Sequence, residues 1–578
     1  MTYKIKLILL AAIICLVGIL IYSNTFSSSF HFDDKFAIEN NPAIRDIWDP
    51  AAIWNFATVR FVGFLTFALN YHFNGLDVFG YHLINLLIHI ALSMAVFVLI
   101  MLTFSTPALK NSKVSENVLL VSFLGSLVFL THPLQTETVT YIHQRLTLLS
   151  TFFYIISLNL YIKSRLLQER AKSSEESSIY YALSLITALL GMFTKEIVGT
   201  LPLLILVYEF FFFRTKDRFE WKRTVPFFIF PAITLSILFI TRPVWYADVK
   251  RLAVDPLGMS LTTFFTQLHV RVTYLRLFLI PINQNVIYDY PIQKTLFEAP
   301  VLASLCLHLL ILYSAILAFR KYRLFSFGIF WIYLTLLPES SIVPLNDVII
   351  EHRIYLPMVG YSFFLVAILH YFLREKRRVF GIALLIAVIV VCSFLSHARN
   401  RVWKDELTLW SDVISKSPGV IGPYISRSNY YWQNGEYDKA ICDCDRALEI
   451  DPLSASLYLN RGNIYLSKSE YEKAVADYNK ALAIMPDNML VYSNRAIAYR
   501  RNGNYDSAIS DYTEILRRSP LDADNYLNRA IAYAYKGDRH KAYSDIQKIY
   551  RMGYKIDPEI ISSIVRILEK KIKHRSRS

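Results

Sequence analysis

Long apolar runs separated by short basic segments fill the chain from residue 7 to about residue 396. Beyond residue 399 the chain turns polar, and no stretch there has the roughly 17–25 apolar residues that a transmembrane helix needs. The pattern therefore predicts an all-α protein with two parts. A polytopic helical membrane domain is expected over 1–398, and a soluble helical domain is expected to follow a connecting segment over 399–420.

The apolar runs are long enough for about eleven crossings of a bilayer. They lie near residues 7–23, 79–104, 118–134, 146–162, 179–194, 197–213, 225–241, 299–318, 324–338, 355–373 and 379–396. The run 264–280 contains His269, Arg271 and Arg276, and we interpret it, like 61–73, as a helix at the outer interface. The first run follows two lysines, and we interpret it as a retained anchor rather than a cleaved signal peptide.

The formal net charge of +15 would suggest a nucleic-acid partner in a soluble protein. Here the basic residues collect between the predicted spans, which is typical of loops that stay in the cytoplasm. They are Lys110/Lys113, Lys163/Arg165/Arg170/Lys172, Arg214/Lys216/Arg218, Arg320/Lys321/Arg323 and Arg374/Lys376/Arg377/Arg378. The charge therefore indicates topology and no nucleic-acid partner, and an odd number of crossings places the C-terminal domain outside.

The soluble part is periodic, with equivalent residues recurring every 34 positions. The recurring sets are Pro418/Pro452/Pro486/Pro520, Tyr424/Tyr458/Tyr492/Tyr526, Tyr431/Tyr465/Tyr499/Tyr533 and Ala440/Ala474/Ala508/Ala542. This period and this pattern of aromatic, small and proline residues are typical of tetratricopeptide repeats, which stack helix pairs into an α-solenoid. We predict four repeats over 421–554 and a capping helix with a basic tail over 555–578.

Four polar motifs fall on the outer face in this topology: Asp33/Asp34, the turn 132–145, the turn 194–196 and the segment 338–357. Polar groups close to hydrocarbon are costly and often line a site. The acidic pair alone could be a solvated or helix-capping pair, or it could supply a general base for a hydroxyl acceptor. Adjacent like charges raise the pKa of one carboxyl, which favours that second role. One acidic pair is weak evidence for a metal, and we predict none, although metal dependence stays open.

Three cations at the outer ends of predicted spans have carboxylates near them in the sequence. They are Arg145, Lys195 and Arg353, with Glu137, Glu196 and Glu351 as supporting acids. Each could be a paired charge that ends a helix. Together with His132 and His352 they indicate a clamp for a phosphate, which at a bilayer surface is a lipid phosphate.

The segment "FHFDDKF" after the first span resembles the acidic motif of protein O-mannosyltransferases. The segments "GYHLINLLIHI", "THPLQTETVTYIHQR", "TKEIVGTLPLLILVYE" and "PESSIVPLNDVIIEHRIYLP" are similar to hallmark segments of the transmembrane-and-tetratricopeptide-repeat proteins of the glycosyltransferase C superfamily. The resemblance implies an inverting glycosyltransferase that takes a sugar, typically mannose, from a polyprenyl phosphate to a hydroxyl on the non-cytoplasmic face. It implies no further cofactor. It also implies that Asp33 is the catalytic base, with Asp34 beside it.

Asn460, Asn494 and Asn528 recur at the repeat interval, each followed by an arginine. Stacked repeats would align them in a ladder that suits the backbone of a protein or peptide acceptor. Alternatively the asparagines join the two helices of a repeat, and Arg461, Arg495 and Arg529 pair with Asp477, Asp511 and Asp545.

Two other functions compete with the enzyme. One is a non-enzymatic, membrane-anchored tetratricopeptide scaffold for an envelope complex, although about eleven spans exceed what an anchor needs. The other is a lipid or polymer transporter, for which charges in the middle of spans would be expected. The absence of glycosylation sequons and of a retention signal favours a bacterial inner membrane with periplasmic repeats over an endoplasmic reticulum membrane with lumenal repeats.

Overall fold

The computed structural model describes residues 2–110, 117–169, 174–214, 221–241, 256–338, 348–373 and 378–575. Across these ranges the regular structure is helical, as the apolar and repeat patterns predict. The chain divides into two compact units, Met1–Lys416 and Ser417–Ser578. Most of 399–420, which was expected to be a connector, therefore belongs to the first unit.

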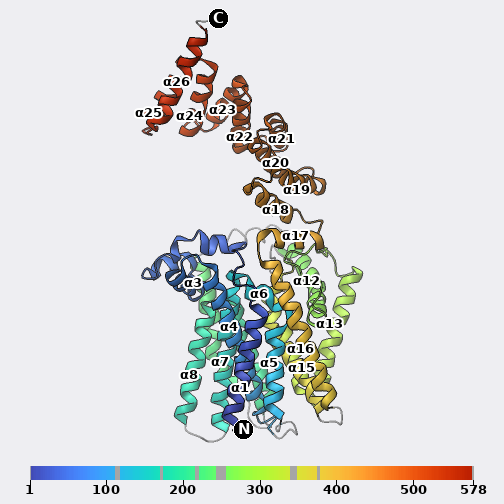
Figure 1. The fold of residues 1–578 in the computed structure, drawn as a ribbon. Coiled ribbons are helices and arrows are strands. Elements are labelled where there is room, and N and C mark those ends of the chain that lie inside the picture. Colours follow the sequence, from blue (N-terminus) through green and yellow to red (C-terminus); the bar gives the residue numbers. More distant parts are fainter. Residues whose placement is uncertain are drawn as a thin grey trace. The chain divides into compact units, whose positions relative to one another are not determined.

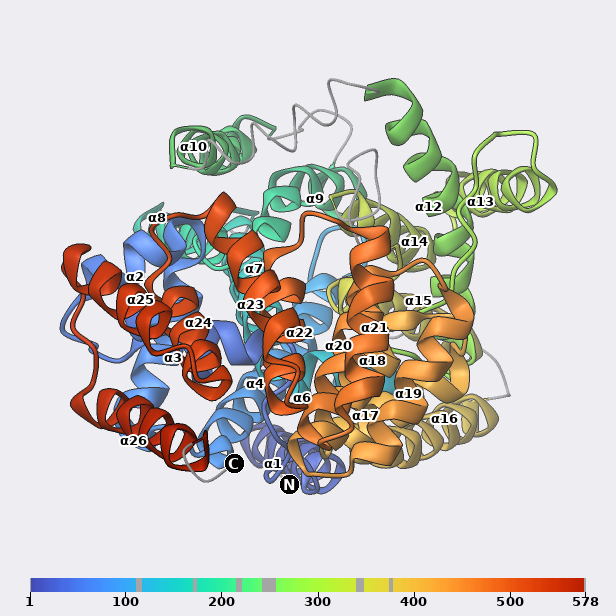
Figure 2. The same cartoon turned by 90° about the horizontal axis from the view of Figure 1, so that it is seen from above.

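The first unit is a helix bundle (Figures 1 and 2). Figure 1 shows its longer helices running roughly parallel, with the N-terminus at one end of the bundle. These helices are α1 (Tyr3–Tyr22), α4 (Val78–Phe104), α5 (Val118–Thr131), α7 (Arg145–Glu169), α8 (Ser174–Met192), α9 (Leu201–Tyr208) with η8 (Glu209–Phe213), η9 (Trp221–Thr224) with α10 (Val225–Thr241), α12 (Pro256–Leu279), α13 (Ala299–Ala318), α14 (Arg323–Leu336), α15 (Pro357–Leu373) and α16 (Arg378–Asn400).

Shorter elements connect the bundle helices. They are η1 (Lys35–Glu39), η2 (Pro42–Ile44), α2 (Pro50–Ala57), η3 (Thr58–Arg60), α3 (Phe61–Asn74), η5 (Pro133–Gln135), α6 (Thr136–Thr140), η6 (Ile142–Gln144), η7 (Glu196–Thr200), η10 (Glu351–Ile354), η11 (Arg401–Trp403) and α17 (Glu406–Lys416). Figure 1 places α3, α6 and α17 at the end of the bundle opposite the N-terminus. This end corresponds to the outer face of the predicted topology.

Helix length and composition identify the first unit as an integral membrane domain. Among the described residues, seven helices are long and apolar enough to cross a membrane, or up to eight if the bent pair 118–131 and 133–140 is one span. Two of the shorter predicted spans, α14 and 357–369 of α15, are apolar helices below that length. The segment Pro50–Asn74 meets the test, although α3 lies at the end of the bundle. The count of about eleven crossings stays a prediction.

Several predicted cytoplasmic residues lie outside the described ranges. They are Lys113, Arg170, Lys172, Lys216, Arg218, Arg374, Lys376 and Arg377. The same holds for residues 339–347 of the fourth polar motif.

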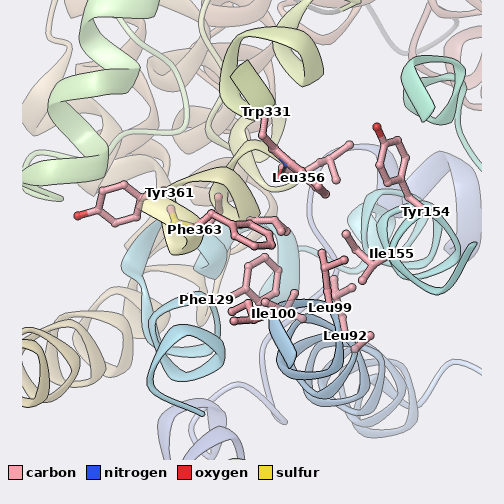
Figure 3. Close-up of a cluster of buried hydrophobic side chains, with 14 of the residues drawn as sticks. Leu92, Leu99, Ile100, Phe129, Tyr154, Ile155, Trp331, Leu356, Tyr361 and Phe363 are labelled. Carbon is pink, nitrogen blue, oxygen red and sulfur yellow. Dashed lines mark hydrogen bonds between the residues drawn. The ribbon is translucent and has the colours of Figure 1, made fainter. Parts of the chain in front are cut away.

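The bundle is held by a buried apolar core (Figure 3). Phe129, Trp331 and Phe363 are fully buried in it, and leucine and isoleucine side chains of α4 and α7 complete the cluster. Helices α14 and α15 approach closely where two glycines face each other. A Cβ atom at Gly328 would lie 2.6 Å from the carbonyl oxygen of Gly360, so no larger residue fits this crossing without a backbone shift.

The second unit is a series of helix pairs followed by one more helix. The pairs are α18 (Ile421–Gln433) with α19 (Tyr437–Ile450), α20 (Ala455–Ser467) with α21 (Tyr471–Ile484), α22 (Met489–Arg501) with α23 (Tyr505–Arg518) and α24 (Ala523–Lys536) with α25 (Arg539–Arg551), and the last helix is α26 (Pro558–Arg575). The alanines that the 34-residue pattern singles out, Ala440, Ala474, Ala508 and Ala542, are all fully buried. A small residue at each of these positions lets paired helices approach, as the pattern predicts.

Candidate active site

The two adjacent aspartates occupy opposite environments. Asp33 is exposed, whereas Asp34 is fully buried. The carboxylate of Asp34 accepts hydrogen bonds from the backbone N–H of His31 at 2.9 Å and of His143 at 2.7 Å. Burial raises the pKa of Asp34 to about 8, and the charge of Asp33 adds less to this shift than burial does. The expected shift in one pKa is present, but burial and not like-charge repulsion is its main cause. Asp34 anchors the loop, and Asp33 is presented to solvent.

Asp33 lies beside the turn that begins α7. Its backbone N–H donates to the hydroxyl of Tyr141 at 3.0 Å. The ring of His143 stacks on Phe67 with ring centroids 6.4 Å apart, and within the described chain its Nδ1 has no hydrogen-bond partner. His143 lies within electrostatic range of Asp33, Lys195, Arg60 and His352. We call His143 and these four groups the polar cluster.

His143 was not among the site residues predicted from the sequence. Its only signal was a position within the polar turn 132–145, where His132 was chosen instead. Arg60 was also missed, because it lies outside the four polar motifs, directly before the run 61–73 that we interpreted as an interfacial helix.

Lys195 reaches the same cluster from the turn before η7. Its side chain is buried, and its Nζ donates to Thr147 Oγ1 at 3.1 Å, one helical turn beyond His143. The neighbouring Glu196 forms an ion pair with Arg60 at 3.0 Å. Arg60 and Glu196 therefore join the first outer loop to η7.

His352 of the polar cluster contacts Glu137. The Nδ1 of His352 and Oε1 of Glu137 are 2.6 Å apart, although the two residues are 215 positions apart in the chain. Arg353 and Arg399 both act electrostatically on Glu137. Arg353 is buried, and one guanidinium nitrogen donates to the carbonyl oxygen of Val348 at 3.4 Å.

Glu351 anchors a second loop rather than pairing with Arg353. Its carboxylate accepts hydrogen bonds from Gln284 Nε2 at 2.9 Å, from the backbone N–H of Asn285 at 2.7 Å and from Tyr288 Oη at 2.6 Å. Burial raises the pKa of Glu351. The loop that follows α12 is therefore fixed to the start of η10 by one buried carboxyl group.

Arg145 is not placed to bind a phosphate. Its side chain is 0% exposed, and its guanidinium donates to Asn85 Oδ1 and Asn70 Oδ1 at 2.8 Å each, and to the backbone carbonyls of Tyr81 at 3.0 Å and Thr66 at 3.2 Å. These bonds occupy four of the five N–H donors of the guanidinium. The expected role of Arg145 is corrected to a structural one, in which it joins α3, α4 and α7.

His132 is likewise engaged by the backbone. Its Nε2 donates to the carbonyl oxygen of Phe278 at 3.1 Å, and its Nδ1 accepts from the backbone N–H of Leu134 at 3.3 Å. Both ring nitrogens are used, and the side chain is buried. The expectation that His132 binds the donor phosphate is therefore wrong, because the ring has no free hydrogen-bonding position.

In the second unit, each repeat arginine joins two repeats. Arg461 binds both carboxylate oxygens of Asp477 at 2.7 Å each and also contacts Asp445 of the preceding repeat. Arg495 contacts Asp511 and Asn479 in the same way. Arg529 likewise contacts Asp545 of its own repeat and Thr513 of the preceding repeat. The arginine pairing named as the alternative is confirmed.

The repeat asparagines lie on the first helix of each pair. Asn460, Asn494 and Asn528 are half-buried on α20, α22 and α24. The Nδ2 of Asn494 donates to Asn463 Oδ1 of the preceding repeat at 2.9 Å. The side chains are thus partly accessible, and a role in binding stays a prediction.

No group of three or more His, Cys, Asp or Glu residues within the described ranges could hold a metal ion. The polar cluster instead offers the exposed carboxylate of Asp33, the imidazole of His143 and the buried ammonium of Lys195. This combination can accept a proton and stabilise a developing anion.

Models of the tetratricopeptide repeat match the second unit at residues 422–452, 444–476 and 493–543, and a TPR repeat model matches residues 462–503. The second unit is a tetratricopeptide-repeat domain. A solved structure of MamA protein is similar over 26% of this chain and 85% of its own length, at 20% identity and a TM-score of 0.25.

Curated relatives extend the similarity into the membrane domain. The protein O-mannosyl-transferase F38B6.6 of Caenorhabditis elegans is 23% identical over 75% of this chain and 62% of its own length. The human protein O-mannosyl-transferase TMTC1 is 22% identical over 77% of this chain and 55% of its own length. The chain thus spans about 55–62% of the length of these relatives, and the resemblance drawn from the sequence motifs is confirmed.

Proposed function

We propose that the chain is an inverting membrane glycosyltransferase that moves a sugar, mannose in the simplest case, from a polyprenyl phosphate to a protein hydroxyl. The transfer would take place on the non-cytoplasmic side of the membrane domain. The names of the relatives support the sugar and the protein acceptor. The observation that carries the proposal is the exposed Asp33, which lies within electrostatic range of His143 at a cluster also reached by Lys195 and His352.

In the proposed reaction the carboxylate of Asp33 takes the proton of the acceptor hydroxyl. The acceptor oxygen then attacks C1 of the sugar from the face opposite the phosphate, and the C1–O bond to the phosphate breaks with inversion. The polyprenyl phosphate leaves with the bonding electron pair. Asp33 suits the role of base because it is exposed, whereas Asp34 is enclosed by backbone donors and serves to position the loop.

The leaving phosphate requires cations near the reacting carbon. Lys195 and His352 are the candidates, because the charges of both act on His143, whose backbone N–H is bonded to the loop of Asp33. Arg353 would add further positive charge, since it acts electrostatically on Glu137, the partner of His352. Such preorganised charges stabilise a developing anion more effectively than water does.

We further propose that the repeats recruit the acceptor through Asn460, Asn494 and Asn528. An amide side chain offers both a donor and an acceptor, so a row of them can bind the backbone of an extended peptide of any sequence. The arginines are unsuited to this task, because aspartates already hold them.

The test uses the full chain, purified and reconstituted in liposomes, with polyprenyl-phosphate mannose and a protein acceptor. Asp33→Asn should lower the transfer rate by about 10²–10⁴-fold, the usual contribution of a positioned base. Asp46→Asn, at an exposed acid of the same outer loop, is the matched control and should leave the rate unchanged. Near wild-type transfer by Asp33→Asn would refute the assigned base. Absence of transfer by the wild-type chain with every lipid-linked sugar tried would favour the scaffold alternative.

A further inference from the structure

Phe32, the residue before Asp33, has a backbone conformation that a phenylalanine rarely adopts. Its φ is +46°, in the left-handed region that favours glycine. A bulky residue keeps such a conformation only when the surroundings hold it there. Because the next residue in the chain is Asp33, whatever holds Phe32 also sets the direction of the Asp33 carboxylate.

Three aromatic side chains surround the ring of Phe32. The centroid of Trp410 lies 4.9 Å away, that of Tyr141 5.6 Å away and that of Trp403 6.3 Å away, all in edge-to-face geometry. This geometry is the favourable one for aromatic pairs. Trp410 belongs to α17 and Trp403 to η11, so two of the three rings come from the end of the first unit.

The same segment contacts the acidic loop at further points. The backbone N–H of Ser29 donates to the carbonyl of Lys404 at 3.1 Å, and His31 Nε2 donates to the carbonyl of Trp403 at 2.9 Å. Beyond the aspartates, Lys35 forms an ion pair with Glu406. Contacts therefore lie on both sides of Asp33, and they join it to a segment about 370 positions away in the chain.

We propose that η11 and α17 form a clamp that holds the acidic loop in its working conformation, with Trp410 as a positioning residue for Asp33. Trp410 does not touch the reactants and acts through Phe32. The proposal rests on the proposed function of Asp33 as base. In this proposal α17 does more than connect the two units along the chain. It also holds the loop that carries the Asp33 carboxylate.

A purely structural role for Trp410 predicts something different. In that case its loss would loosen α17 in the same way as the loss of any other buried side chain of that helix. Val413 is fully buried on α17, and as an aliphatic side chain it makes none of the ring contacts that hold Phe32. Val413→Ala is therefore the matched control.

The experiment is a double-mutant cycle in the full-length protein, with kcat and the donor KM measured for polyprenyl-phosphate mannose. Trp410→Ala should lower kcat by about tenfold or more, since small misplacements of a reacting group cost this much, with the donor KM within about twofold of wild type. Trp410→Phe should recover most of the loss. In the Asp33→Asn background, Trp410→Ala should cost nothing further, because the group that it positions is already gone.

Trp410→Leu, which keeps apolar volume on α17, is the second variant in case Trp410→Ala does not fold. A kcat loss with an unchanged thermal transition supports the clamp. Wild-type kcat in both Trp410→Ala and Trp410→Leu overturns it. So does a loss in the Asp33→Asn background as large as the loss that Trp410→Ala causes in the wild-type background. A loss of the same size in Val413→Ala also overturns it. If Asp33→Asn itself transfers at the wild-type rate, the proposed base is wrong. If Asp33→Asn is impaired and the Trp410 variants are not, only the clamp fails.

Discussion

The carboxylate of Asp34 accepts a hydrogen bond from the backbone N–H of His143 at 2.7 Å, although the two residues are 109 positions apart in the chain. This bond joins the loop after α1 to the turn that begins α7. It explains why the two neighbouring aspartates differ so strongly in exposure. Asp34 is buried where these two segments meet, and Asp33 faces solvent. The same bond brings the loop of Asp33 to the polar cluster around His143, where the proposed reaction takes place.

The raised pKa of Asp34 predicts a pH-dependent stability. The carboxyl is neutral in the folded protein up to a pKa of about 8, whereas in the unfolded chain it ionises near pH 4. Its contribution to the free energy of unfolding is therefore fully present below about pH 4 and is lost as the pH rises toward 8. The slope from this single group is at most about 1.4 kcal/mol per pH unit. Thermal unfolding in detergent between pH 4.5 and 8.5 measures it.

Asp34→Asn cannot ionise and should flatten this part of the curve. Asp46→Asn should leave it unchanged, because that side chain is exposed. An unaltered slope in Asp34→Asn would show that another group causes the pH dependence.

Arg145→Ala should damage stability and not donor binding. Removal of the guanidinium leaves the amide oxygens of Asn70 and Asn85 without their donor in a buried site. We expect the free energy of unfolding to fall by about 3 kcal/mol. Arg145→Lys should recover only part of this loss, since an ammonium cannot reproduce the planar set of donors. Unchanged stability with a loss of donor affinity would instead restore the phosphate-binding role expected from the sequence.

Lys195→Ala should weaken use of the donor with little effect on stability. The ammonium donates to Thr147 Oγ1, and its removal takes a cation from the polar cluster. Charge-assisted hydrogen bonds contribute about 1.5–3 kcal/mol, which predicts a fall of roughly 10–150-fold in kcat/KM for the lipid-linked sugar. Arg60→Gln is the comparison, because Arg60 is held by Glu196 at the edge of the cluster. Equal effects of the two changes would mean that only the overall charge matters.

Substitutions of the repeat asparagines should affect acceptor use, whereas substitutions of the repeat arginines should affect stability. The combined change Asn460→Ala, Asn494→Ala and Asn528→Ala should keep the repeats folded and keep transfer to a short peptide, while transfer to a long protein acceptor is lost. Arg461→Ala should lower the thermal transition instead, because Asp477 and Asp445 lose their shared cation. If the triple variant still glycosylates long acceptors, the three asparagines do not bind the acceptor.

Topology can be tested at Lys321. Because the basic residues between α13 and α14 are predicted to be cytoplasmic, a cysteine at this position should resist an impermeant reagent applied outside. A cysteine at exposed Asp33 should react with the same reagent. Labelling of Lys321→Cys from outside would overturn the count of about eleven crossings.

The sequence by itself determined the features that depend on short-range periodicity. Apolar runs predicted the bundle helices, since a helix that meets lipid must be apolar over its whole length. The 34-residue spacing predicted the helix pairs, and even the pairing of Arg461 with Asp477 was visible as an alternative. In these cases each interaction recurs within one element or one repeat, so the pattern along the chain contains it.

Only the tertiary structure decided which polar residues meet. Asp33 and Asp34 are indistinguishable as neighbouring letters, and the fold alone buries one and exposes the other. Arg145 looked like a phosphate ligand, but two asparagines from α3 and α4 fill its hydrogen-bonding positions. His143 and Trp410 had no special signal, because their roles come from contacts across more than 100 positions of chain. Helix packing sets these contacts, and local spacing contains no information about them.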